Sequence, residues 1–364
     1  MQRSLLFASA AAAVAAVATA ASAAASALVL APPALTPVFV LGGEGYYCFR
    51  IPALVALSST ELLAFAEGRK LSCADHGFVD LVSKRSLDGG RTWGALQVVR
   101  SESTDAQHVT VGNPAPVVLA GGGGGALLLP FCRNNIEVGV LRSDDRGHSW
   151  RLSANISVPA GWSWVATGPP GSMQVQRGGR IVVPMNFANK SVPAASSAFL
   201  SDDGGATFRL ARDTVTDGNE DQAVELAWRS NATASVLHLS MRSGKEGHRL
   251  AAESADGGDS WSAPWATITE TACEGSVLAL PRSRRLVMST AFAAQRTNMT
   301  LHASSDDGHS WAPLLQVFGG FSAYSSLIDA STAGGAEAVG ILFEQGATSP
   351  FAGISFARVE LPPQ

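Results

Sequence analysis

The octapeptide Ser86-Leu-Asp-Gly-Gly-Arg-Thr-Trp93 is the first of five copies of one pattern, Ser-x-Asp-x-Gly-x-Ser/Thr-Trp/Phe. The copies begin at Ser86, Ser143, Ser201, Ser254 and Ser304. Successive copies start 57, 58, 53 and 50 residues apart, a spacing typical of four-stranded propeller blades. In each copy the Asp carboxylate can accept backbone N–H groups ahead of it, and the Gly can take positive φ. The pattern therefore predicts an all-β propeller with a turn at each copy, whose closing aromatic ring is buried between blades.

The segments between the copies are short apolar runs that predict strands. A strand pattern ends near the Ser of each copy, so we expect the turn to join the third and fourth strands of a blade. Five copies, together with the strand material after Trp311, indicate about six blades. We therefore expect a six-bladed β-propeller over residues 37–361, with the N-terminal and C-terminal strands closing the ring together.

The composition excludes some classes of partner and suggests a compartment. The 364 residues carry a formal net charge of -4 with 15% charged residues, so we expect no nucleic-acid partner. Residues 1–30 contain one basic residue, then an uncharged Ala-rich run, and predict a signal peptide or a signal anchor. Four N-glycosylation sequons agree with the secretory pathway: Asn155, Asn189, Asn231 and Asn298. We expect a secreted, extracellular or lysosome-like lumenal protein, bound to a membrane only if residues 1–30 are retained.

The cysteines and histidines give no indication of a metal site. The four cysteines form no CxxC motif, and the seven histidines form no HExxH motif, so we expect neither a metal ion nor another cofactor. An oxidising compartment permits a disulfide such as Cys48–Cys73, although the sequence does not set the connectivity. Cys132 and Cys273 lie in apolar runs and are expected to be free and buried.

A second motif, Phe49-Arg50-Ile51-Pro52, precedes the five copies. In this combination the chain resembles the exo-sialidases (neuraminidases) from about Phe39 to Leu361. The resemblance implies a six-bladed propeller that hydrolyses terminal sialic acids of glycoproteins, glycolipids or oligosaccharides with retention of configuration. A trans-sialidase and a non-catalytic glycan-binding propeller are the alternatives. One stretch, 167–174, departs from the family pattern, so a deaminated sialic acid or a different N-acyl group is a further possibility for the substrate.

The substrate of such enzymes carries a carboxylate on its anomeric carbon, and guanidinium groups suit its recognition because each can bond two oxygens. The resemblance assigns this role to Arg50, Arg242 and Arg296. It matches Glu344 to a carboxylate that holds the first arginine, Arg50, in place.

A general acid must protonate the departing glycosidic oxygen. The resemblance places this acid at Asp75, with Arg69 nearby; Asp80 is the competing carboxylate, but its apolar neighbours indicate a strand. Asn113 matches a loop that contacts substrate, and an ordinary turn is an equal alternative for it.

A neutral phenol suits the nucleophile because the reacting carbon already bears a negative carboxylate that would repel an attacking Asp or Glu. The resemblance assigns this role to Tyr324, one of three tyrosines in the chain. A phenol with a pKa near 10 needs a base, and Glu220 is matched to that role, with Glu225 as the alternative.

Overall fold

The computed structural model describes residues 32–120, 125–245 and 247–363, and within these every regular helix or strand is a β-strand. The predicted signal segment, residues 1–30, lies outside the described residues. The unit Pro32–Gln364 is compact. In the described ranges no helix has the length and apolar character needed to cross a membrane. The all-β prediction is thus confirmed.

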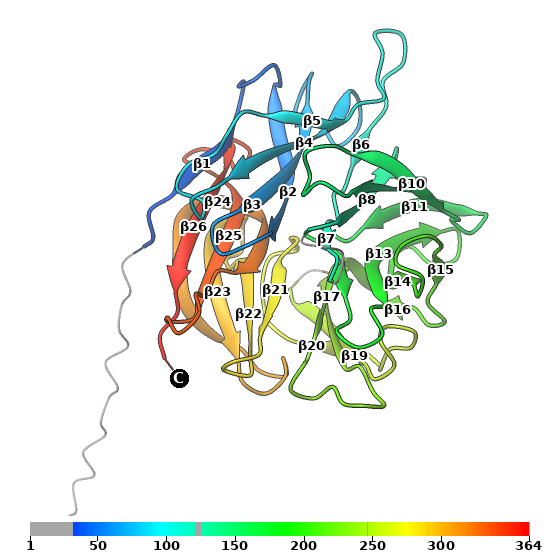
Figure 1. The fold of residues 1–364 in the computed structure, drawn as a ribbon, viewed down its shortest axis with the longest axis vertical. Helices are drawn as coiled ribbons and strands as arrows, with labels where there is room; N and C mark the ends of the chain where they lie inside the picture. Colours follow the sequence, from blue (N-terminus) through cyan, green and yellow to red (C-terminus); the bar gives the residue numbers. More distant parts are fainter. Residues whose placement is uncertain (1–31, 121–124, 246, 364) are drawn as a thin grey trace, which may run out of the picture. The chain divides into compact units, whose positions relative to one another are not determined.

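The strands of this unit form five hydrogen-bonded sheets that follow one another about a common centre (Figure 1). The first sheet contains β2 (Cys48–Ala56), β3 (Leu62–Arg69), β4 (Val79–Ser86) and β5 (Gln97–Arg100). The second contains β6 (Val111–Gly112), β7 (Val117–Val118), β8 (Leu127–Arg133), β9 (Glu137–Ser143) and β10 (Arg151–Ile156). The third contains β11 (Trp162–Thr167), β12 (Met173–Gln174), β13 (Ile181–Asn189), β14 (Ala195–Ser201), β15 (Arg209–Leu210) and β16 (Val215–Thr216).

The remaining strands form one four-stranded and one seven-stranded sheet. The fourth sheet contains β17 (Gly218–Glu225), β18 (Leu237–Ser243), β19 (Arg249–Ser254) and β20 (Trp265–Ala266). The fifth contains β21 (Ser276–Leu280), β22 (Arg285–Ala291), β23 (Thr297–Ser304), β24 (Ala312–Asp329), β25 (Ala338–Gly346), β26 (Gly353–Glu360) and β1 (Thr36–Val40). The pairing of β1 with β26 joins the two ends of the unit, as expected.

The five sheets differ from the six separate blades that the sequence predicts. The reason is β24, an 18-residue strand that runs without a break through two sets of pairings. Its first part, from Ala312 to Phe321, pairs with β23, and its second part, from Phe321 to Asp329, pairs with β25. Hydrogen bonding therefore continues from one four-strand set into the next, and the arrangement is propeller-like with one sheet of seven strands.

The repeated octapeptide forms the same hydrogen-bonded turn in all five places. In the third copy Ser201 Oγ donates to Asp203 Oδ1 at 2.8 Å, and Thr207 N donates to the same oxygen at 2.9 Å. Gly205 N donates to Ser201 Oγ at 2.9 Å, with Gly205 at a φ of 90°. Equivalent bonds occur in the other four copies. Each turn follows the third strand of a four-strand set, which confirms the predicted position.

The aromatic residue that closes each octapeptide packs into the core between neighbouring sheets. Trp93 lies edge-on to Phe356 of β26, with ring centroids 5.7 Å apart, and Trp150 lies edge-on to Phe65 of β3 at 5.9 Å. These contacts bury apolar area that holds adjacent sheets together. The inner strands then present their ends to a common centre, where the predicted site residues lie.

Candidate active site

Arg50 lies at the centre of the unit in a two-pronged contact with Glu344. Its Nε and Nη2 donate to the two carboxylate oxygens of Glu344 at 2.9 and 3.1 Å, and both residues are buried. Ile51 N donates to Glu344 Oε1 at 3.0 Å, in a stretch of β2 where the register shifts and Ile51 has a φ of 56°. Burial lowers the pKa of Arg50, but the charge and hydrogen bonds of Glu344, together with Tyr324 and Asp75, outweigh it and raise that pKa above its ordinary value. Arg50 is therefore charged and fixed in orientation.

Tyr324 and Glu220 form the second contact of the site. The Tyr324 hydroxyl donates to Glu220 Oε1, and Arg242 Nη1 donates to Glu220 Oε2 at 3.0 Å. Burial and then the charge of Glu220 raise the pKa of Tyr324 well above its ordinary value, so the phenol is neutral in the free protein. Glu220 lies in the place where a carboxylate would accept the phenolic proton. Transfer of the phenolic proton from Tyr324 to Glu220 is thus unfavourable in the free protein. It becomes favourable only when the phenol oxygen attacks a reacting partner.

A β-bulge sets the position of Tyr324. The register of β24 against β25 shifts between Ser322 and Ser325, and two consecutive amides bond to carboxylates instead of strand carbonyls. Tyr324 N donates to Glu344 Oε2 at 3.3 Å, and Ser325 N donates to Glu274 Oε2 at 2.8 Å. Glu274 is 1% exposed, and its Oε1 has no partner among the described residues. Burial raises the pKa of Glu274 well above its ordinary value, which favours the neutral form of this carboxyl group.

Asp75 lies on the loop between β3 and β4, and its side chain is 69% exposed. Its Oδ1 accepts from Arg69 Nη1 at 2.9 Å and from Arg50 Nη1 at 3.3 Å. Partial burial raises the pKa of Asp75, but the charges of Arg69 and then Arg50 outweigh it and hold that pKa below its ordinary value. The competing carboxylate, Asp80, is buried in β4 and accepts from Tyr46 Oη at 2.9 Å, away from this arginine pair.

Arg69 is held by a carboxylate that sequence reasoning missed. Arg69 Nε and Nη2 donate to Glu67 Oε2 at 3.0 and 2.6 Å, and Glu67 Oε1 accepts from Asn113 N at 2.9 Å. Asn113 has a φ of 53°, and its Oδ1 accepts from Asn135 Nδ2 at 2.9 Å. Glu67 therefore links Arg69, which contacts Asp75, to Asn113. A buried Glu two residues before an Arg at a strand end was the only sequence indication of this link.

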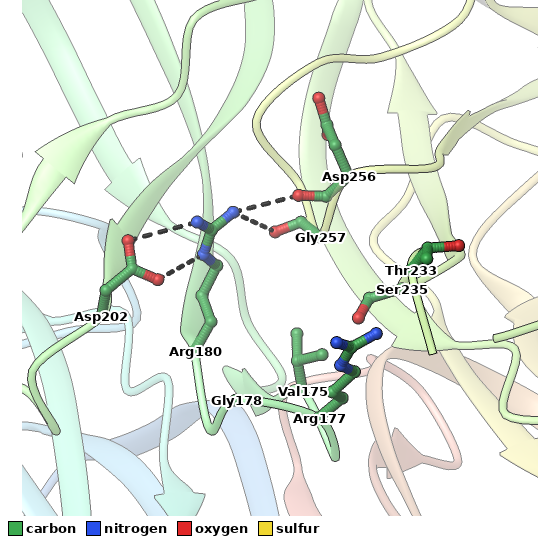
Figure 2. A pocket seen from close by; sticks show the side chains of 9 residues that line it. All are labelled: Val175, Arg177, Gly178, Arg180, Asp202, Thr233, Ser235, Asp256 and Gly257. Atoms are coloured by element: carbon green, nitrogen blue, oxygen red, sulfur yellow. Dashed lines mark hydrogen bonds and ion pairs between the residues drawn. The ribbon is translucent and has the colours of Figure 1, made fainter. Parts of the chain in front are cut away.

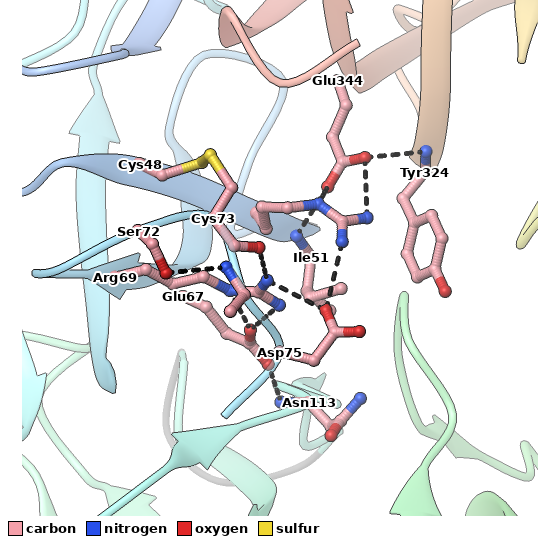
Figure 3. Close-up of polar contacts among 12 residues, drawn as sticks. Cys48, Ile51, Glu67, Arg69, Ser72, Cys73, Asp75, Asn113, Tyr324 and Glu344 are labelled. Atoms are coloured by element: carbon pink, nitrogen blue, oxygen red, sulfur yellow. Dashed lines mark hydrogen bonds and ion pairs between the residues drawn. A yellow bond between two sulfur atoms is a disulfide. The ribbon is translucent and has the colours of Figure 1, made fainter. Parts of the chain in front are cut away.

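The guanidinium groups of Arg50 and Arg296 both lie over the ring of Tyr324. The guanidinium carbons of Arg50 and Arg296 lie 5.0 and 5.6 Å from the ring centroid. In the described ranges Arg296 forms no ion pair, whereas Arg50 and Arg242 each contact a glutamate. Figure 3 shows Asp75 between Arg69 on one side and Tyr324 on the other, with Glu344 above them in the view. Together with Asn113, the structure gathers all the predicted site residues into one neighbourhood.

The alternative residues lie in other contacts. Glu225, at the far end of β17, accepts from Gln176 N at 2.8 Å instead of contacting Tyr324. Tyr46 bonds to Asp80, and Tyr47 is 53% exposed. Geometry therefore favours Glu220 with Tyr324.

The cysteines pair in the manner that the sequence permits. Cys48 and Cys73 form a disulfide, whereas Cys132 and Cys273 are free and buried. Cys273 packs with Ile51, Ala323 and Tyr324 in a small apolar cluster. The disulfide thus ties β2 to the loop that carries Asp75, and the free thiol of Cys273 lies next to Tyr324.

The polar cavity at Arg180 offers no comparable chemistry. Figure 2 shows a cavity in which Arg180 donates to Asp202 Oδ1 at 2.6 Å and to the carbonyl oxygen of Asp256 at 3.0 Å. These bonds link two neighbouring octapeptide turns and use the guanidinium for that purpose. Across the described part of the chain, no group of three or more His, Cys, Asp or Glu residues has the arrangement of a metal site.

Comparisons with known proteins bear on this geometry. Residues 60–337 match the family described as BNR repeat-like domain. The chain is 30% identical to a sialidase of Micromonospora viridifaciens over 90% of this chain and 55% of that protein. It is 26% identical to an exo-alpha-sialidase of Aspergillus fumigatus over 72% of this chain and 69% of that protein. Among solved structures, a Hadza microbial sialidase superimposes with a TM-score of 0.77 at 25% identity, over 90% of this chain and 68% of that one. The chain thus spans between about half and two thirds of the length of these relatives.

Proposed function

The chain belongs to the BNR repeat-like domain family, with sialidases as its relatives, and on this basis we propose that it is a retaining exo-α-sialidase. Its substrates are terminal sialic acids on glycoproteins, glycolipids or oligosaccharides. The single observation that carries the proposal is the hydrogen bond from Tyr324 to Glu220, with the guanidinium groups of Arg50 and Arg296 close to the phenol ring. This arrangement suits attack on a carbon that bears a carboxylate, because the nucleophile is neutral and the surroundings are cationic.

The arginines bind and orient the sugar carboxylate. Arg296 has no competing ion pair among the described residues, and Arg50 is held ready by Glu344. Arg242 contacts Glu220, so it both presents a charge to the substrate and orients the base. Fixed guanidinium groups lose little further freedom on binding, which favours recognition of a planar anion.

The reaction proceeds in two displacements. Asp75 donates a proton to the departing glycosidic oxygen while Tyr324 Oη attacks the anomeric carbon and passes its proton to Glu220. Water then attacks the same carbon, the ionised Asp75 removes its proton, and Tyr324 departs and regains its own proton. Two inversions give the sugar with its original anomeric configuration.

Substrate binding changes the proton affinity of Asp75. In the free site Arg69 and Arg50 hold the pKa of Asp75 below its ordinary value. A bound carboxylate offsets the charge of Arg50, and the pKa of Asp75 rises toward the value that a general acid needs. The substrate thereby helps to protonate the residue that cleaves it.

The finer features of architecture and location belong to the same proposal. The seven-stranded sheet counts as two blades that share β24, which gives a six-bladed propeller over residues 37–361. The Cys48–Cys73 disulfide supports passage of the chain through an oxidising compartment, with residues 1–30 as signal peptide or anchor. The destination is outside the cell or a lysosome-like lumen.

The test measures release of fluorophore from an aryl α-sialoside by the full chain, beside Asp75→Ala and Tyr324→Phe. Tyr47→Phe is the matched control because this tyrosine is exposed. Turnover that is lost in Tyr324→Phe and kept in Tyr47→Phe supports the proposal. A folded chain that releases nothing from this substrate or from its deaminated analogue, yet binds sialylated glycans, would indicate a binding propeller. Transfer to added lactose in preference to water would indicate a trans-sialidase.

A further inference from the structure

The disulfide joins two segments that each carry a residue of the proposed site. Cys48 begins β2 two residues before Arg50, and Cys73 lies two residues before Asp75 in the loop between β3 and β4. Figure 3 shows this disulfide beside Arg69, with Asp75 nearby. The disulfide therefore connects β2, which carries Arg50, to the loop that carries Asp75.

Besides the disulfide, hydrogen bonds hold the backbone of the loop at residues 70–78. Lys70 N donates to Phe78 O at 3.0 Å and closes its base, and Gly77 N donates to Thr110 Oγ1 at 3.0 Å. Nearer the tip, Cys73 O accepts from Arg69 Nη1 at 2.5 Å.

The side chains of the loop make further contacts: Asp75 Oδ1 accepts from Arg69 and Arg50, and the ring of His76 lies edge-on to Trp164 at 5.9 Å. At the base of the loop the ring of Phe78 lies 5.6 Å from that of His108. The residues on either side of Cys73, including Asp75, are exposed. Packing of the kind that holds Tyr324 is therefore absent from this tip among the described residues.

We propose that Cys48 and Cys73 are positioning residues, whose disulfide holds the loop so that Asp75 meets the glycosidic oxygen. This inference rests on the proposed function. Proton transfer needs donor and acceptor within about 2.6–3.2 Å, and the Asp75 carboxylate, exposed at the loop tip, keeps such a position only if the backbone that carries it is restrained. Tyr324 and Glu220 lie on β24 and β17, which the disulfide does not join, so attack by the phenol does not depend on it.

The proposal predicts different losses of activity on two kinds of substrate. A sialoside of 4-methylumbelliferone has an acidic leaving group that departs with little help from a general acid. Sialyl-lactose has a poor leaving group that needs protonation. The double variant Cys48→Ser with Cys73→Ser should lose roughly 10²-fold in kcat on sialyl-lactose and less than about threefold on the aryl sialoside. Asp75→Asn should show a split in the same direction.

A second arm uses the unaltered protein and avoids failure of a variant to fold. Dithiothreitol reduces the disulfide to two thiols and is itself oxidised to its cyclic disulfide. We expect selective loss of sialyl-lactose turnover in the wild type and no further change in the double variant. Cys132→Ala, which removes a free buried thiol, should leave the ratio of the two activities unchanged.

The outcomes are distinct. Equal loss on both substrates, or loss that parallels a fall in melting temperature, would assign the disulfide to stability alone and overturn the inference. An unchanged ratio after confirmed reduction would overturn it as well. A folded wild type that turns over neither substrate would instead overturn the proposed function, and the inference with it.

Discussion

The octapeptide turns and the cluster around Tyr324 are built in opposite ways. In the turns each hydrogen bond joins residues two to four positions apart, as from Ser201 to Asp203 and from Thr207 to Asp203. In the cluster Arg50 and Glu344 are 294 positions apart, and Tyr324 and Glu220 are 104 apart. The turns therefore form from local sequence alone, whereas the cluster forms only when the sheets have come together.

This contrast predicts that the turns contribute mainly to stability and the central cluster mainly to activity. Each of the five turns contributes a small part of the free energy of unfolding, so loss of the bonds in one turn leaves the other four turns intact. The central contacts occur once each, and their loss removes a step of the reaction. Substitutions at the two regions should accordingly differ in what they change.

The largest effect is expected for Tyr324→Phe at the centre. Removal of the phenol oxygen removes the proposed nucleophile, and kcat on an aryl sialoside should fall by about 10³-fold or more, roughly 4 kcal/mol in the barrier. Melting temperature should change little because the ring still packs with Cys273 and Ile51. Steady-state kinetics and calorimetry check both statements. Full activity in the variant would place the nucleophile elsewhere.

The second largest effect is expected at Glu274. Its carboxyl group accepts from Ser325 N and so helps to position the neighbouring residue, Tyr324. Glu274→Leu leaves that amide without an acceptor and should lower kcat about 10²-fold, as a small displacement of a reacting group does. Glu274→Gln keeps a neutral acceptor and should retain most of the activity. If the two variants are equally impaired, the role of Glu274 as a neutral acceptor is wrong. Comparison of kcat with KM for both is the measurement.

The pH dependence of stability tests the environment of His238, a buried histidine that packs against Gly308 of the fifth turn. Burial lowers the pKa of His238 to about 4, with His309 also lowering it and Asp307 raising it. Between about pH 6.5 and pH 4 the unfolded chain binds a proton that the native state does not. His238 alone should therefore lower the free energy of unfolding by about 3 kcal/mol as pH falls through that window.

His238→Phe should flatten this dependence in part, because burial lowers the pKa of His302 to about 4 as well and contributes with the same sign. Urea unfolding at several pH values gives the curves, with exposed His148→Gln as the control. A pH dependence of His238→Phe identical to that of the wild type would contradict the prediction.

The smallest effect is expected for Asp203→Ala in one turn. It removes the acceptor for Ser201 Oγ and Thr207 N, and should lower the free energy of unfolding by about 1–2 kcal/mol. Activity should be unchanged, since this turn does not contact Tyr324. Exposed Asp105→Ala, outside the turns, serves as the control. Loss of activity without loss of stability in Asp203→Ala would contradict the prediction that the turns contribute to stability and not to activity.

Most of the architecture was predictable from the sequence because it depends on local turns. Gly205 takes a φ of 90° in a turn that Asp203 closes, and the same residue types force the same turn wherever they recur. The number of separate sheets was not predictable, since no residue marks the point where β24 passes from one set of pairings to the next.

The choice of partners was decided by the tertiary structure. The spacing of residues left Asp75 and Asp80, and likewise Glu220 and Glu225, as alternatives, because a carboxylate's partner depends on which strands meet. Glu67 and Glu274 had no motif to identify them, and their roles follow from the burial of bonds to Arg69 and to Ser325 N.

The sequence by itself thus determined the turns, the strands and the family, since each depends on residues close together in the chain. Only the tertiary structure decided which acid lies beside which arginine and which cysteines pair. Those contacts cross up to 294 positions, and they exist because closed sheets bring the ends of distant strands to one centre.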